Sequence, residues 1–431
     1  MQRTAPDPQR EPEPDPPVGL PVLPELAAHL SAAADRTEAE PPGGSVPLRT
    51  AACGYWARRG LATTPGRVLA APGAPALLLA LYAAADGAVV LPRPCSEWYA
   101  PAARLLGRPV YLVPVPAESG GTPDPFALLE TVRRARMHGD GPRVLVLSVA
   151  DDPTGTCPAP EQLHEVCEAA AQEGLWIISD ETRRDLLHDP HDTVLLSPAE
   201  MLPGEVVVLT DLRATLVPAS WPAALARFPA TDRGALLRTA ALDALSAVST
   251  PLPGPVGCAV THALGEPDEV RARTATAARV YGTLAAALHH TVTEAGAVCR
   301  PPHSGSHLYA DLEPLRRPLA VRGIVESRAL ERKLAPWGAR GGHRFGDAPG
   351  ALRVRLGAEV LLGADRELRQ RVLAAPDPLE LPHITEALTA LSRALAGLTR
   401  QSRRCARRPR GGPSEGSDSL RAYRSRIEQT E

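Results

Sequence analysis

The sequence has almost no lysine. Its 431 residues include 47 lysines and arginines, and only one of these, Lys333, is a lysine. A coding bias toward arginine explains such replacement at surface positions. Arginine cannot act as a nucleophile or base as lysine does, because its guanidinium group stays protonated in proteins. Chemistry that requires a lysine amine is therefore restricted to Lys333.

Other features are also scarce. Aromatic residues make up 3% of the chain, and its seven cysteines show no CxxC or other metal-ligand spacing, so we expect reduced thiols and no metal site. His188 and His191 form the one close histidine pair of note, and we interpret it as part of a solvated loop. No apolar run is long enough to span a bilayer, and the Pro-, Glu- and Asp-rich N-terminus is unlike a signal peptide. With a net charge of −2, the composition predicts a cytoplasmic protein without a nucleic-acid or membrane partner.

The most informative stretch lies between residues 143 and 187. An apolar, β-branched run at 144–149 predicts a buried strand, and a turn at 152–156 follows it. A helical pattern then covers 160–173, and a second buried strand at 175–179 runs into Asp180. This is a βαβ unit with polar groups at the carboxyl ends of both strands, where open α/β sheets bind ligands.

Two segments of this unit resemble the class I and II aminotransferases, which depend on pyridoxal phosphate (PLP) and have fold type I. That family has Asn-Pro-Thr-Gly-Thr followed by Asp-Glu-x-Tyr, and this chain has Asp152-Pro-Thr-Gly-Thr and Asp180-Glu-Thr-Arg183. The resemblance implies an α/β fold with a mostly parallel central sheet flanked by helices in a large domain, plus a smaller α/β domain. An ordinary βαβ unit of another doubly wound protein is the alternative.

The resemblance also implies where a cofactor would bind. The segment from residue 67 resembles the family's first strand, turn and helix, whose backbone N–H groups hold the cofactor phosphate at a helix N-terminus. Gly73 and Ala74 stand at those amides, and Pro75 lacks an N–H group. Trp98 or Tyr99 is the candidate ring packed over the cofactor, with plain core packing as the alternative. By the same resemblance, Asp180 pairs with the pyridine nitrogen, Asp152 replaces the residue that donates to the ring hydroxyl, and Arg183 replaces a tyrosine.

The segment 204–221 resembles the strand that carries the catalytic lysine of the family. Its register places Arg213 at the lysine, with Thr210 and Leu212 at the two serines of the phosphate site. In the segment 352–356, which resembles a strand of the small domain, Arg355 takes the position that binds the substrate carboxylate. A surface arginine on an exposed strand is the alternative. Lys333 is expected on a helix of the small domain, where it cannot replace the missing lysine.

These features predict five regions along the chain: a Pro-rich segment at 1–22, a helical segment at 23–60, a large domain at 61–270, a small domain at 271–400 and a solvated tail at 401–431. A degenerate aminotransferase relative, acting as a binding or dimer partner, is the first functional interpretation. It would pair with itself or with a related subunit. The alternative is a transferase that binds PLP or pyridoxamine phosphate non-covalently and acts on an amino or keto acid. Conventional transamination is nearly excluded by the lysine count, and the sequence leaves enzymatic activity undecided.

Overall fold

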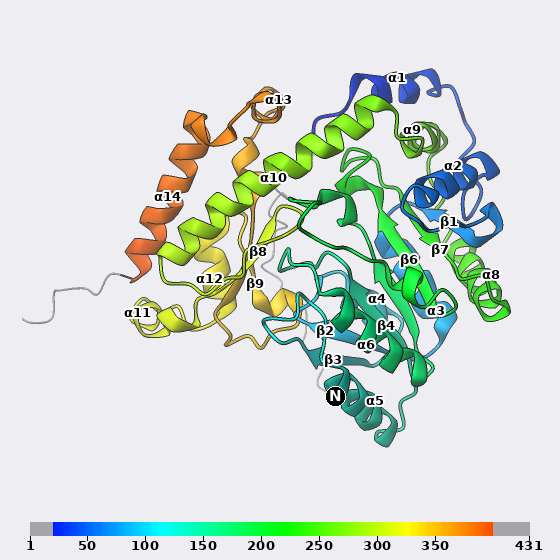
Figure 1. Cartoon of the computed structure of the whole chain (residues 1–431), viewed down its shortest axis with the longest axis horizontal. Helices are drawn as coiled ribbons and strands as arrows, with labels where there is room; N and C mark the ends of the chain where they lie inside the picture. The colour runs from blue at the N-terminus through cyan, green and yellow to red at the C-terminus, as the bar shows by residue number, and fades with distance from the viewer. Residues whose placement is uncertain (1–19, 400–431) are drawn as a thin grey trace, which may run out of the picture. The chain divides into compact units, whose positions relative to one another are not determined.

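The computed structural model of the protein describes residues 20–399, apart from the side chains at 214 and 399. The predictions for residues 1–19 and for the tail at 401–431 lie outside the described residues. Two β-sheets organise the described chain (Figure 1). The predicted boundary at residue 270 between a large and a small domain lies close to the start of helix α10 and stays a prediction.

The larger sheet has seven strands in the order β1-β7-β6-β5-β4-β2-β3. Neighbouring strands from β3 to β6 run parallel, whereas β7 is antiparallel to both β1 and β6. The mostly parallel sheet expected from the sequence is therefore present, with an antiparallel strand, β7, that was not predicted. Its strands are β1 (Val68–Ala71), β2 (Ala88–Arg93), β3 (Val110–Pro114), β4 (Pro142–Ser148), β5 (Trp176–Asp180), β6 (Val206–Asp211) and β7 (Ala224–Arg227).

Both faces of this sheet are covered by helices, which explains why its strands read as continuous apolar runs. Successive side chains of a strand point to opposite faces. In β4, Leu145 and Leu147 accordingly pack in one buried cluster with α1, α2, α5, α6 and α9, and Val144 and Val146 pack in the other with α3, α4 and α8. The helices are α1 (Pro24–Ala32), α2 (Val46–Ala57), α3 (Ala74–Ala85), α4 (Tyr99–Leu105), α5 (Pro125–Met137), α6 (Pro160–Gln172), α7 (Pro198–Met201), α8 (Asp232–Ala247) and α9 (Gly254–Leu264).

A long helix, α10 (Asp268–Glu294), leads to the smaller sheet, and α14 lies beside it (Figure 1). This sheet is antiparallel with the order β8-β10-β9. The remaining elements are β8 (His307–Asp311), β9 (Arg340–Gly341), β10 (Arg353–Gly357), α11 (Arg316–Ala320), α12 (Ser327–Leu334), α13 (Arg366–Ala374) and α14 (Pro382–Thr399). The predicted strands at 144–149, 175–179 and 352–356 and the helices at 160–173 and about 267–296 are confirmed within two residues. Helices α13 and α14 were not predicted.

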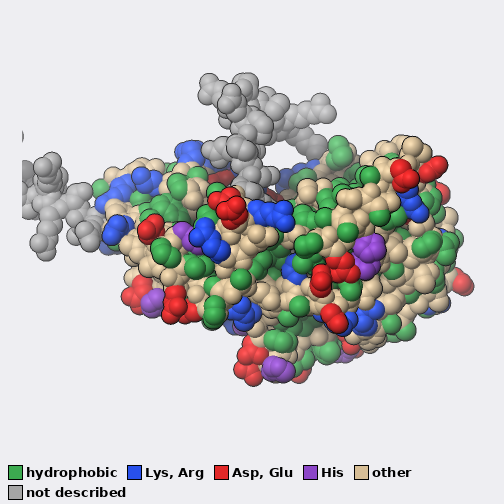
Figure 2. Space-filling view, turned by 90° about the horizontal axis from the view of Figure 1, so that it is seen from above, with side chains coloured by type: hydrophobic (Ala, Val, Ile, Leu, Met, Phe, Trp, Pro, Cys, Tyr) green, Lys and Arg blue, Asp and Glu red, His purple; other side chains and the backbone are tan. Residues whose placement is uncertain are grey.

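None of the helices described within residues 20–399 is both long and apolar enough to cross a membrane. On the face shown in Figure 2, acidic and basic side chains are interspersed among apolar ones, and no large area carries charge of one sign.

Candidate functional site

Five acidic side chains gather at one edge of the larger sheet. Strands β4, β5 and β6 are adjacent and parallel, so their carboxyl ends meet there, with Ser148 of β4 paired to Asp180 of β5. The acidic residues stand at or just after these ends: Asp151, Asp152, Asp180, Glu181 and Asp211. All five are buried, with at most 8% of each residue exposed. Because burying a charge is costly unless it is paired, the partners of these groups define the chemistry of this edge.

Asp152 is bound by two arginines. Its Oδ1 accepts from Nη1 of Arg355 at 2.8 Å and lies 3.2 Å from Nη1 of Arg183, while its Oδ2 accepts from the Ser96 hydroxyl at 2.7 Å. Burial alone would raise the pKa of Asp152, but the charges of Arg183 and Arg355 hold it well below its ordinary value. Asp152 is therefore a carboxylate inside an ion-pair network.

This network brings together three residues that the sequence placed at the cofactor and substrate positions. Asp152 follows β4, Arg183 follows β5, and Arg355 comes from β10 of the smaller sheet. Only 11% of the Arg355 side chain is exposed, so its interpretation as a surface arginine is wrong. The guanidinium expected to bind a substrate carboxylate instead binds a carboxylate of the chain itself.

A second carboxylate occupies the start of helix α3. The backbone N–H of Ala74 donates to Oδ2 of Asp211 at 3.0 Å. Arg213 closes around the same carboxylate, with its Nε 2.9 Å from Oδ1 and its Nη2 2.6 Å from Oδ2. Gly73 has a φ of 100°, and a Cβ added there would lie 3.4 Å from Nη2 of Arg213. Arg213 therefore lies against the turn whose amides were expected to hold a phosphate.

These residues do not fit a phosphate group in the arrangement found. The N-terminus of a helix attracts an anion through its exposed N–H groups. Here the Ala74 amide already donates to Asp211, and Pro75 has no N–H group. A phosphate in the same place would be repelled by the negative charge of the Asp211 carboxylate. Thr210, expected near the phosphate, is buried in β6 opposite Leu225.

Asp180 also has protein partners. The Tyr99 hydroxyl donates to its Oδ2 at 2.6 Å, and the Thr182 N–H donates to its Oδ1 at 3.0 Å. Burial raises the pKa of Asp180, and these hydrogen bonds partly offset that effect. Trp98 meets the Tyr99 ring edge-on at 4.7 Å between centroids and packs beside the apolar cluster of α3 and α4. A cofactor-stacking role for Trp98 stays a prediction.

His307 and Glu359 lie next to this network, and neither was predicted from the sequence. Nε2 of His307 is 3.3 Å from Oε1 of Glu359, and Ser306 donates a hydrogen bond to the same carboxylate. Burial lowers the pKa of His307 to about 3, so the ring is neutral at physiological pH. No local pattern marks this pair, because His307 is in β8 and Glu359 follows β10.

Asp151 differs from its neighbour Asp152 in its protonation. Burial raises the pKa of Asp151 to about 7, although hydrogen bonds from Thr154 oppose the shift. The Thr154 hydroxyl donates to its Oδ2 at 2.6 Å. Burial therefore brings the pKa of Asp151 into a range suited to proton transfer near neutral pH. A nucleophilic amine is what the edge lacks, since Lys333 is exposed on α12 and takes no part in these contacts.

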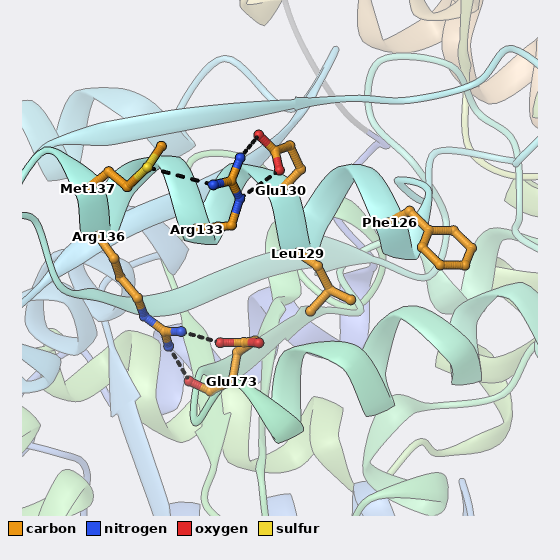
Figure 3. Close-up of a pocket in the computed structure, with 7 residues that line it drawn as sticks. All are labelled: Phe126, Leu129, Glu130, Arg133, Arg136, Met137 and Glu173. Atoms are coloured by element: carbon orange, nitrogen blue, oxygen red, sulfur yellow. Dashed lines mark hydrogen bonds and ion pairs between the residues drawn. The ribbon is translucent and has the colours of Figure 1, made fainter.

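Two surface hollows lie away from this edge. The larger, of about 560 Å³, is bordered by α5 and the end of α6 and contains two ion pairs, Arg133 with Glu130 and Arg136 with Glu173 (Figure 3). Phe126 and Met137 leave much of their side chains exposed in the same region. The smaller hollow, of about 290 Å³, lies between residues 39–43 and 245–252. Neither contains a residue that the sequence placed in the site.

Comparisons with known proteins agree with this architecture. The family model for aminotransferase class I and II matches residues 13–213, so the match ends at Arg213. A probable aspartate/prephenate aminotransferase of Thermus aquaticus is 28% identical over 200 residues, which cover 45% of this chain and 50% of that protein. The aspartate/prephenate aminotransferase of Thermus thermophilus gives the same identity and covers 49% of its length, so the matched region spans about half of these relatives.

Solved structures match over more of the chain. The aspartate aminotransferase of Thermus thermophilus with maleate superposes with a TM-score of 0.72 at 20% identity, covering 88% of this chain and 90% of that one. An aminotransferase from Mycobacterium tuberculosis also gives a TM-score of 0.72 at 20% identity, covering 89% and 90%. At these identities the likeness shows the fold, which is that of fold type I.

Proposed function

We propose that the chain is a degenerate member of the class I and II aminotransferase family that does not bind PLP covalently and serves as a binding or dimer partner. The family's cofactor is PLP, and its covalent attachment requires a lysine amine. Arg213 stands at that position, and the guanidinium group cannot form the bond.

One observation carries this proposal. Both places expected to bind an external anion are filled by carboxylates of the chain. Asp211 accepts from the Ala74 amide at 3.0 Å, where a cofactor phosphate was expected, and Asp152 accepts from Arg355 at 2.8 Å, where a substrate carboxylate was expected. A ligand would have to displace an internal ion pair at each place before it could bind.

The substituted residues also compensate one another. Asp152 and Arg183 replace an asparagine and a tyrosine of the family pattern, and the two new charges lie 3.2 Å apart. Arg213, which the sequence places at the lysine position, pairs with Asp211. Without Asp152, Arg183 would lose this partner although only 19% of its side chain is exposed, and an uncompensated buried charge typically costs about 3–5 kcal/mol. These ion pairs support the proposal that contacts within the chain have replaced contacts with a ligand at this site.

The test uses the single lysine of the chain. The purified protein is incubated with PLP, and visible absorption is recorded before and after dialysis and after borohydride reduction. We expect no band that survives dialysis in the wild-type protein. Any reduced adduct should map by peptide mass spectrometry to Lys333 or the N-terminal amine, and Lys333→Arg should remove the first of these.

Two variants test whether PLP can bind covalently once the arginine and its carboxylate partner are replaced. Arg213→Lys supplies the amine but leaves Asp211 in place, whereas Asp211→Ala with Arg213→Lys also releases the Ala74 amide. We expect the double variant to retain far more borohydride-fixed PLP than the single one. Arg366→Lys, which adds a lysine at an exposed position on α13, is the matched control for a second surface amine.

A saturable band that survives dialysis and is fixed by borohydride to a residue other than Lys333 or the N-terminal amine would refute the proposal. A saturable band that is lost on dialysis would favour the alternative, a transferase that binds PLP or pyridoxamine phosphate non-covalently and acts on an amino or keto acid. The buried Asp180 at the end of β5 supports that alternative, since it keeps the position that pairs with the pyridine nitrogen in the family. Turnover of amino donors with keto acids would then be measured directly. Sedimentation of the purified chain, alone and with a related active subunit, tests the dimer role.

A further inference from the structure

Helices α1 and α9 bring three metal-ligating side chains together, far from the carboxyl edge of the sheet. Glu25 and His29 lie one turn apart on α1, and His262 lies on α9. Their ligand atoms are all within 4.8 Å of one another. Among the residues that the structure describes, this is the one group of three or more His, Cys, Asp or Glu side chains with that property.

The three side chains are held in direct contact. Nε2 of His262 is 2.6 Å from Oε1 of Glu25. The rings of His29 and His262 are stacked with 3.7 Å between centroids and 23° between planes. Glu25 and His262 are half-buried, and α1 and α9 are held together by packing, because Leu26 of α1 is fully buried in the same apolar cluster as Val260 of α9.

This ligand set is suited to a transition-metal ion. Two imidazole nitrogens and one carboxylate oxygen form a set found in zinc enzymes, with water in the fourth position. Ligand atoms bonded to one tetrahedral Zn²⁺ at roughly 2.0–2.2 Å lie about 3.4 Å from each other. To reach that geometry, ligand atoms that lie within 4.8 Å of one another would have to move closer together, and the two stacked rings would have to turn so that one nitrogen of each points at the ion.

We propose that Glu25, His29 and His262 bind a divalent transition-metal ion, of which Zn²⁺ suits the ligands best. The ion would connect α1 to α9 across 237 positions of sequence, between Glu25 and His262. It would thereby stabilise the attachment of the N-terminal helix, because a ligand that binds only the folded state shifts the unfolding equilibrium. No metal site was predicted from the sequence, where the cysteines lack metal-ligand spacing. Glu25 and His262 are too distant in the chain to form a recognisable motif.

The alternative is an ordinary helix contact made of a hydrogen bond and a ring stack. The two interpretations differ in their response to metal. The full chain without an added histidine tag is treated with chelator, dialysed, and titrated with Zn²⁺ by calorimetry. Cobalt(II) provides an optical probe of the same site, since its visible absorption reports nitrogen and oxygen ligation. Mg²⁺, which prefers an octahedral set of oxygen ligands, is the negative control.

The variants are His29→Ala, His262→Ala and the control His164→Ala. His164 forms a pair with Glu168 one turn away on α6, at 3.3 Å, but that pair is not part of a three-ligand group. We expect one equivalent of Zn²⁺ to bind the wild-type and His164→Ala proteins. His29→Ala and His262→Ala should each weaken Zn²⁺ binding. The loss of affinity should exceed the 10–100-fold that removal of an outer-shell partner causes. Zn²⁺ should raise the Tm of the wild-type protein but not that of His262→Ala.

Several outcomes would overturn the proposal. These are the absence of stoichiometric Zn²⁺ binding, equal affinity in His29→Ala and the wild type, or an equal loss in His164→Ala. Cysteine thiols can bind Zn²⁺ independently of this site, and such background binding would persist in the double variant His29→Ala/His262→Ala. Should His262→Ala fail to fold, His29→Ala alone decides the matter, because it leaves the hydrogen bond between Glu25 and His262 in place.

Discussion

Replacing Asp152 with asparagine removes one negative charge from the ion-pair network and almost no volume. The oxygen of an asparagine side chain can still accept from Ser96, so the change isolates the charge. Arg183 and Arg355, whose side chains are 19% and 11% exposed, would then lack their shared carboxylate. Because removal of one partner leaves a buried charge uncompensated, we expect the free energy of unfolding to fall by about 3 kcal/mol or more.

Urea unfolding followed by tryptophan fluorescence measures this loss. The control is Asp268→Asn, which removes the carboxylate of an exposed ion pair with Arg271 and should cost less than about 1 kcal/mol. The double variant Asp152→Asn/Arg183→Tyr restores both residues of the family pattern. It should be more stable than the sum of the two single effects predicts, with a coupling energy of roughly 0.5–3 kcal/mol.

A second signature distinguishes an unpaired charge from a general loss of packing. In the Asp152→Asn variant, residue 152 carries no charge, so Arg355 and Arg183 can bind the carboxylate of an added ligand. Succinate should therefore raise the Tm of Asp152→Asn more than that of the wild type. It would bind the folded state of the variant and not its unfolded state. A stability loss below about 1 kcal/mol, strict additivity with Arg183→Tyr, or equal responses to succinate would refute the reasoning.

Two further predictions concern buried polar groups. Because the pKa of His307 is about 3 in the folded protein and the unfolded value is about 6.5, only the unfolded chain takes up the proton between these limits, so acid reduces stability. His307→Gln should remove this effect. In urea unfolding, the free energy of unfolding of the wild type relative to the variant should fall by roughly 1.4 kcal/mol between pH 5.5 and 4.5. A difference between the two proteins that does not change with pH would contradict the assignment. Tyr99→Phe removes a hydrogen bond from buried Asp180 and should cost about 1–3 kcal/mol. Tyr82→Phe is its control, since the Tyr82 hydroxyl is buried without a partner, and an equal cost in both variants would contradict the role of that bond.

Local physical chemistry made much of the fold readable from the sequence. The apolar runs of β4 and β5, the turn between β4 and α6, and the helical spacing of α6 are features of adjacent residues, so the βαβ unit was predicted within two residues. Helix α14 was not predicted, although Ile384, Leu391 and Leu395 recur at helical spacing and are buried. Strand β7 has only four residues, and its pairing with β1 and β6 joins distant segments.

What the sequence by itself determined was that Lys333 is the single lysine of the chain, and the prediction that Arg213 takes the lysine position of the family pattern rests on the sequence alone. Only the tertiary structure determined which groups of the chain bind the Ala74 amide and the Arg355 guanidinium. Ala74 and Asp211 are 137 positions apart, and Asp152 and Arg355 are 203 positions apart, yet each pair is hydrogen-bonded. The physical reason is that a buried carboxylate must find a positive charge or an N–H donor, and which one lies within 3 Å depends on how the two sheets and helix α3 are packed, not on residues nearby in the chain.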